Sequence, residues 1–82
     1  MDKSKYKFVT YIPSFSGQTY TLITPPASGY RPAAAENGDW DSNQFKITSV
    51  CWQGSKNAAV IWFDRAMSGG ARIDILWVNG YD

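Results

Sequence analysis

Side chains that could bind a sugar are concentrated in one short segment of this chain. The segment reads NGDWDSN, and its candidate binding residues are Asn37, Asp39, Trp40, Asp41 and Asn43. The flat ring of a tryptophan can cover the C–H face of a pyranose, and carboxylates and amides can hydrogen-bond to its hydroxyls. The flanking residues predict a loop, and loops on rigid sheets often carry binding groups. We therefore expect a saccharide site here; the alternative is that Trp40 packs into the core and the acids solvate a turn.

The same segment partly matches a calcium loop. Asp39, Asp41 and Asn43 are spaced like the first three oxygen ligands of an EF-hand. The match then ends, because Gln44 stands where that loop needs glycine and Val50 where it needs a bidentate glutamate. We expect no metal or other cofactor, with calcium as the open alternative.

Three further tryptophans lie outside this segment. Trp52, followed by Gln53, precedes a turn and is a second candidate for stacking on a saccharide, although packing against the neighbouring hairpin is the favoured interpretation. Trp62 and Trp77 stand within apolar runs, which favours a place in the core or in an interface between protomers. Tyr30 is expected to pack beside a turn.

The residue types exclude several kinds of catalytic site. The chain has no histidine and one cysteine, so Ser-His-Asp triads, Cys-His nucleophiles and histidine-ligated zinc are absent. Glycoside hydrolysis needs only two carboxylates, but a cleft that buries a sugar needs ~300 Å³ or more, which a domain this small hardly provides. We expect no enzymatic activity; a cleft between subunits leaves hydrolysis open. The available carboxylates are Glu36, Asp39, Asp41, Asp64 and Asp74.

Composition and charge narrow the class of protein. With 82 residues, 44% of them hydrophobic, the chain predicts one ordered domain over 1–82, with residues 1–5 as a flexible tail. The net charge is +1, and the basic residues cluster only at Lys3, Lys5 and Lys7, so we expect no nucleic-acid partner. No apolar run approaches the ~20 residues that span a bilayer, so we expect no membrane insertion.

The chain consists of short β-rich runs separated by Gly, Pro, Asn and Ser. Because sandwiches and barrels have this pattern, we predict an all-β antiparallel sandwich. Five strands leave open sheet edges, which favours a homo-oligomer. The expected strands are 5–12, 18–24, 44–52, 58–63 and 72–78, with a long loop at 25–43 and turns at 54–57 and 64–71. The run AAVIWF at 58–63 is almost entirely apolar, which predicts a central strand covered on both faces. In 72–78, alternation places Ile73, Ile75 and Trp77 on one face.

Four other side chains have a predicted place on this scaffold. Asp64 and Arg65 are expected to form a surface pair at the start of a turn. Asp74 alternates with apolar neighbours, and we expect it to face outward or across a subunit contact. Cys51 lies on a strand and is expected to be a small buried residue.

Two segments resemble the C-terminal head of bacteriophage receptor-binding proteins, the distal domain of tail fibres and baseplate tips. They read TLITPPASGYRPAA at 21–34 and GARIDILWVNGYD at 70–82. The resemblance implies a jelly-roll-like sandwich assembled as a homotrimer at the virion tip, acting outside the cell on a bacterial surface saccharide. Only the turn at 29–32 corresponds to the family pattern residue by residue, and it is structural. No binding residue carries over.

From the residues and the resemblance together, we expect a non-catalytic module that binds a bacterial surface saccharide. One alternative is a structural domain that trimerises or caps a fibre. Another is a free-standing small β protein that binds and inhibits a protein partner, for which an exposed apolar patch is required.

Overall fold

The computed structural model describes residues 5–38 and 45–80. Most of these residues lie in strands, and every strand pairing is antiparallel, which confirms the all-β antiparallel fold. The trimer stays a prediction, because the structure is of a single chain. The elements are β1 (Tyr6–Tyr11), β2 (Ser14–Ser16), β3 (Tyr20–Ile23), β4 (Tyr30–Asn37), β5 (Ile47–Gln53), the 3-10 turn η2 (Gly54–Lys56), β6 (Ala58–Phe63), β7 (Ser68–Gly70) and β8 (Ile73–Asn79).

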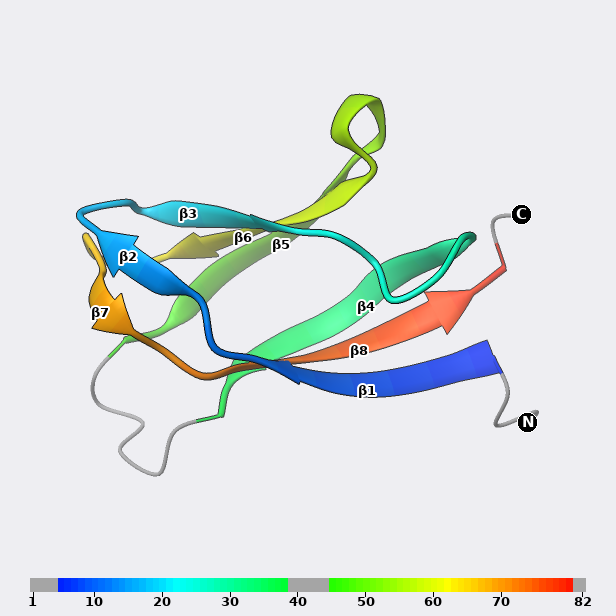
Figure 1. The fold of residues 1–82 in the computed structure, drawn as a ribbon, viewed down its shortest axis with the longest axis horizontal. Coiled ribbons are helices and arrows are strands. Elements are labelled where there is room, and N and C mark those ends of the chain that lie inside the picture. The colour runs from blue at the N-terminus through cyan, green and yellow to red at the C-terminus, as the bar shows by residue number, and fades with distance from the viewer. Residues whose placement is uncertain (1–4, 39–44, 81–82) are drawn as a thin grey trace.

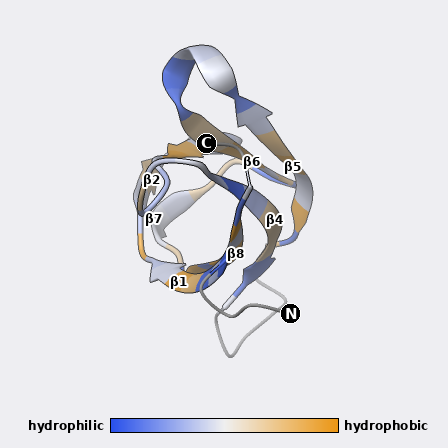
Figure 2. Cartoon of the chain, turned by 90° about the vertical axis from the view of Figure 1, so that its right-hand side faces the viewer, coloured by the Kyte–Doolittle hydropathy of each residue, from blue (hydrophilic) through white to orange (hydrophobic). Residues whose placement is uncertain are grey.

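The strands form two larger sheets and one small one. One sheet has the order β1-β8-β4 and the other the order β3-β6-β5, while β2 and β7 pair with each other at one end of the molecule (Figure 1). Seen from the side, β1 and β8 lie in one layer and β5 and β6 in the other (Figure 2). Each larger sheet therefore has one central strand, β8 or β6, which is paired on both sides.

The two central strands supply most of the buried core. Ile73, Ile75 and Trp77 of β8 have no exposed surface, which confirms that these residues share the inner face of their strand. On β6, residues 58–61 are buried, as predicted for a central strand, but Trp62 is not. Phe45, which precedes β5, completes the group of fully buried large side chains.

The predicted loop at 25–43 is wrong over residues 30–37, because these form the eight-residue strand β4. Residues such as Ala33 have little preference for strands, but β8 offers a free edge that β4 pairs with. Pro32 is accommodated because β4 is itself an edge strand with a bulge between Pro32 and Ala34. The short strands β2 and β7 were also not predicted: β7 falls in the turn expected at 64–71, and β2 lies between the strands expected at 5–12 and 18–24.

Cys51 is exposed, so the prediction of a small buried residue is wrong. The cause is a register shift in β5 between Ile47 and Ser49. One extra residue in a strand reverses which side chains face the core. After the shift Val50 packs against the core, while the Cys51 sulfur lies 3.2 Å from the Ser49 hydroxyl oxygen.

Asp74 is 7% exposed, so the prediction that it faces outward to solvent is wrong, while a place across a subunit contact stays a prediction. Its carboxylate accepts hydrogen bonds from the Thr10 hydroxyl, at 2.7 Å, and from Nε of Arg72, at 3.2 Å. Gly38 also approaches closely, since a Cβ atom there would meet Oδ2 of Asp74 at 2.7 Å. The charge is buried because neighbouring polar groups satisfy it.

The indole of Trp77 is fixed by a partner on the neighbouring strand. Its Nε1–H donates to the Tyr11 hydroxyl at 3.0 Å, and the two rings meet edge to face with centroids 6.4 Å apart. Because Trp77 is fully buried, this hydrogen bond keeps its only polar group satisfied.

We predict that Tyr11→Phe lowers the free energy of unfolding by ~1–3 kcal/mol, because it leaves the buried indole N–H without an acceptor. Urea denaturation measures this change. The matched control Tyr20→Phe, at an exposed position, is expected to change stability by no more than ~0.5 kcal/mol. Equal stability of Tyr11→Phe and the wild type would contradict the role assigned to this hydrogen bond.

The bulge in β5 leads to a second prediction, which concerns the accessibility of the Cys51 thiol. A thiol-specific reagent such as 5,5′-dithiobis(2-nitrobenzoic acid) should label Cys51 in the folded protein without denaturant, because the side chain lies on the solvent side of the sheet. Labelling that requires unfolding would show that β5 has the unbulged register.

Candidate functional site

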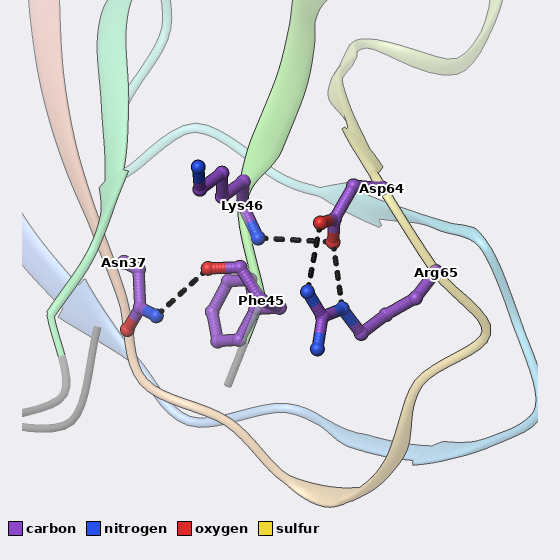
Figure 3. A network of polar contacts seen from close by, with 5 residues as sticks. All are labelled: Asn37, Phe45, Lys46, Asp64 and Arg65. Atoms are coloured by element: carbon purple, nitrogen blue, oxygen red, sulfur yellow. Dashed lines mark hydrogen bonds and ion pairs between the residues drawn. The ribbon is translucent and has the colours of Figure 1, made fainter. Parts of the chain in front are cut away.

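Four residues of the predicted saccharide segment, Asp39, Trp40, Asp41 and Asn43, lie outside the described residues. Asn37 is described, and its side-chain amide donates a hydrogen bond to the carbonyl oxygen of Phe45 at 3.1 Å (Figure 3). This bond joins the end of β4 to the segment that leads into β5. The geometry therefore gives Asn37 a positioning role at the end of β4.

A second set of hydrogen bonds lies beside the bond between Asn37 and Phe45 (Figure 3). Asp64 and Lys46 are bonded in both directions: the Lys46 amide donates to Oδ1 of Asp64, and the Asp64 amide donates to the Lys46 carbonyl, each at 3.0 Å. The Arg65 guanidinium binds both carboxylate oxygens of Asp64 at 2.9 Å, which confirms the predicted surface pair. The start of β5 is thereby fixed to the end of β6.

The second predicted stacking residue, Trp52, lies at the other end of β5. The guanidinium carbon of Arg31 is 5.3 Å from the centroid of its ring, a cation–π contact, and the side chain is half-buried. Trp52 thus contacts Arg31 of β4, in addition to its pairing with Ala59 of β6 within the β5–β6 hairpin. Gln53 is exposed at the start of η2 and makes no side-chain capping bond.

The structure does not unite the predicted site residues that it describes. β5 begins near Asn37, to which Phe45 is bonded, and ends at Trp52 and Gln53 beside Arg31 at the start of β4. Asn37 and Trp52 are therefore at opposite ends of the molecule's β4–β5 side, and one small ligand cannot contact both.

An exposed aromatic pair lies elsewhere, on the solvent side of the β3-β6-β5 sheet. Tyr20 and Trp62 stand directly opposite each other on β3 and β6, with ring centroids 4.7 Å apart and planes tilted by 35°. They remain 45% and 40% exposed, and Leu22 beside them is 43% exposed. We call Tyr20, Leu22, Val60 and Trp62 the outer aromatic face.

Sequence reasoning missed the outer aromatic face because the run AAVIWF was interpreted as buried throughout. The prediction of a core position is wrong for Trp62, although an interface between protomers stays open. The signal that could have found it is alternation: Ile61 and Phe63 are buried on either side of Trp62.

The outer aromatic face is suited to binding without catalysis. Its four residues carry no charge, and they include two aromatic rings and two hydrogen-bonding groups, the Tyr20 hydroxyl and the Trp62 indole N–H. Such a surface can stack on the C–H groups of a sugar ring or pack against another apolar surface.

Neither carboxylate pairing nor metal binding is evident in the described part of the chain. Glu36 and Asp74 are cross-strand neighbours and line a hollow of about 180 Å³, but Asp74 is already bonded to Thr10 and Arg72. Within residues 5–38 and 45–80, no three Cys, Asp or Glu side chains are grouped to hold a metal ion. No helix in those ranges has the length and apolar character needed to cross a bilayer.

Comparison with known proteins adds no relative: no family model matches the sequence, and no curated protein or solved structure is significantly similar to the chain.

We predict a strongly acidic carboxyl at Asp64. Hydrogen bonds from Arg65, and then from the Lys46 amide, hold the pKa of Asp64 well below its usual range. Because the pKa is lowered in the folded state, the stabilising contribution is present above the usual pKa and is lost as the pH falls through the lowered one. Carboxyl NMR titration should show Asp64 still ionised where an ordinary aspartate is protonated.

Substitution of Arg65 tests whether its hydrogen bonds cause the lowered pKa of Asp64. Arg65→Ala should raise the pKa of Asp64 toward the usual value, whereas Arg72→Ala, which removes an arginine that binds a different carboxylate, should leave it unchanged. An ordinary titration of Asp64 in the wild type would contradict the bonded geometry.

Proposed function

We propose that this chain is a non-catalytic binding module that recognises a bacterial cell-surface saccharide. The observation that carries the proposal is the exposed pair of Tyr20 and Trp62, whose rings are in contact on the solvent side of their sheet. Large aromatic side chains are normally buried, and exposed apolar patches in small proteins commonly mark interaction sites.

The physical argument concerns what such a surface can recognise. Pyranose rings have flat C–H faces that stack on aromatic rings, and their hydroxyls are hydrogen-bonded by groups such as the Tyr20 hydroxyl and the Trp62 indole. An open face encloses little of a ligand, so binding by one copy is weak. Several copies presented together raise the effective affinity by avidity.

The biological setting in this proposal is the tip of a phage tail fibre or baseplate, where the module acts outside the host cell. It rests on the resemblance of residues 21–34 and 70–82 to receptor-binding heads. In the turn that corresponds best, Gly29 has φ +84° and Tyr30 is 6% exposed, consistent with a structural role for this segment.

The test is binding to an array of bacterial surface glycans by the wild type and by Trp62→Thr, which retains a residue with strand preference. We expect Trp62→Thr to lose about tenfold or more in affinity, equivalent to ~1.4 kcal/mol of binding free energy. The matched control is Phe8→Thr, which removes an aromatic ring that is 63% exposed on the other sheet. It should bind as the wild type does.

A third variant separates the two candidate sites. Loss of binding in Trp40→Ala with full binding in Trp62→Thr would place the site in the 37–43 segment. Absence of glycan binding by the folded wild type would contradict the saccharide proposal, and capture of a protein by the outer aromatic face would then support the inhibitor alternative.

A further inference from the structure

The strand β3 has one free edge. It lies at the end of its sheet, with β6 as its neighbour. The Phe63 amide donates to the Thr19 carbonyl at 2.8 Å, so Thr19, and by alternation Thr21 and Ile23, direct their backbone groups toward β6. The amides and carbonyls of Tyr20 and Leu22 therefore point away from the sheet, where another strand can pair with them.

The other edge strands of the two larger sheets have features that discourage pairing. β1 carries Lys7, and β4 carries a proline, two charged residues and a bulge. β5 is bent by its bulge, and Trp52 on it is covered by Arg31 of β4. Among the described edges, β3 has neither charge, proline nor bulge.

The segments that line the free edge of β3 are also uncharged. No charged side chain occurs between Lys7 and Arg31 in the sequence. An open groove of about 410 Å³ runs beside β3 and is lined by residues 11–13 and 21–24. Ile12 at this groove is 71% exposed, so an apolar side chain stands next to unpaired backbone.

We infer that β3 is the edge at which a second copy of this chain binds, by antiparallel pairing of β3 with β3. A two-fold axis at Thr21 places Tyr20 of each copy opposite Leu22 of the other, and each such pair exchanges two backbone hydrogen bonds. A second copy fits this edge because two charge-free surfaces meet without repulsion and the outward-pointing groups are self-complementary. The two sheets become one continuous sheet.

The pairing has a consequence for ligand binding. Residues directly opposite each other in a sheet project from the same face. The two outer aromatic faces therefore lie side by side on one surface, which makes the assembly bivalent. This consequence rests on the proposed saccharide function, whereas the pairing itself does not.

The mass in solution tests the pairing directly. Size-exclusion chromatography with light scattering over a range of concentrations should give a species near twice 9.2 kDa that dissociates on dilution. A monomer at all concentrations, or a species of three chains as the fibre-head resemblance implies, would overturn the inference.

A matched pair of variants identifies the edge. Leu22→Pro removes an amide that points away from β6, so the monomer keeps its internal ladder but loses the pairing edge. Leu22→Ala shortens the same side chain and keeps the amide. We expect Leu22→Pro to be monomeric and Leu22→Ala to dimerise; dimerisation by both would overturn the inference.

Cross-linking gives an answer even where Leu22→Pro does not fold. In a Cys51→Ser background, Thr21→Cys should form a disulfide between copies under mild oxidation, since the axis brings the two residues to ~4.5–5.5 Å. Phe8→Cys, on the charged β1 edge, is the control and should remain unlinked. Equal linking at both positions would overturn the inference. A wild-type chain that stays monomeric but binds glycans would contradict the pairing and leave the saccharide proposal standing, whereas a dimer that binds no glycan would do the reverse.

Discussion

The inner face of β8 is the part of the structure on which the rest depends. Ile73, Ile75 and Trp77 have no exposed surface, and β8 is paired on both sides, by β1 and by β4. A domain of 82 residues buries only a modest fraction of its surface, so removal of this row would leave little to hold the two sheets together. The row also contains the indole N–H of Trp77, which Tyr11 satisfies from the neighbouring strand. The same few residues thus fill the core and provide the hydrogen bond that its buried indole N–H requires.

The second sheet contributes its inner face to this core and leaves its outer face open. Ile61 and Phe63 of β6 point inward, while Trp62 between them points to solvent beside Tyr20. Since the core is already filled from both sheets, the exposed pair is not needed to close it. An aromatic pair that lies outside the core is the feature of the described structure that most invites a functional explanation. The uncharged strand β3 carries Tyr20 of this pair and also has the free sheet edge.

The strands with strong sequence patterns were predictable. Alternation in 72–78 gave the correct inner face of β8, and the apolar run at 58–63 gave the central strand β6. β4 was not predictable from its alanines, because pairing with β8 creates it. The burial of Cys51 was predicted wrongly because a bulge in β5, invisible in the sequence, reverses the faces of the strand beyond it.

The candidate site was predictable only in part. The sequence identified aromatic and amide side chains that could recognise a sugar, but the structure separates Asn37 from Trp52 and uses each in a contact within the protein. The pair of Tyr20 and Trp62 belongs to strands far apart in the sequence, and their register could not be derived from local patterns. Cross-strand neighbours of this kind require the fold to be known.

The most direct measurement is an NMR titration that follows the indole N–H signals of the four tryptophans while a bacterial surface polysaccharide is added. The account predicts that the Trp62 signal shifts with the ligand, while the signal of the fully buried Trp77 stays in place. Shifts confined to Trp40 or Trp52, with Trp62 unchanged, would contradict the assignment of the outer aromatic face as the binding surface.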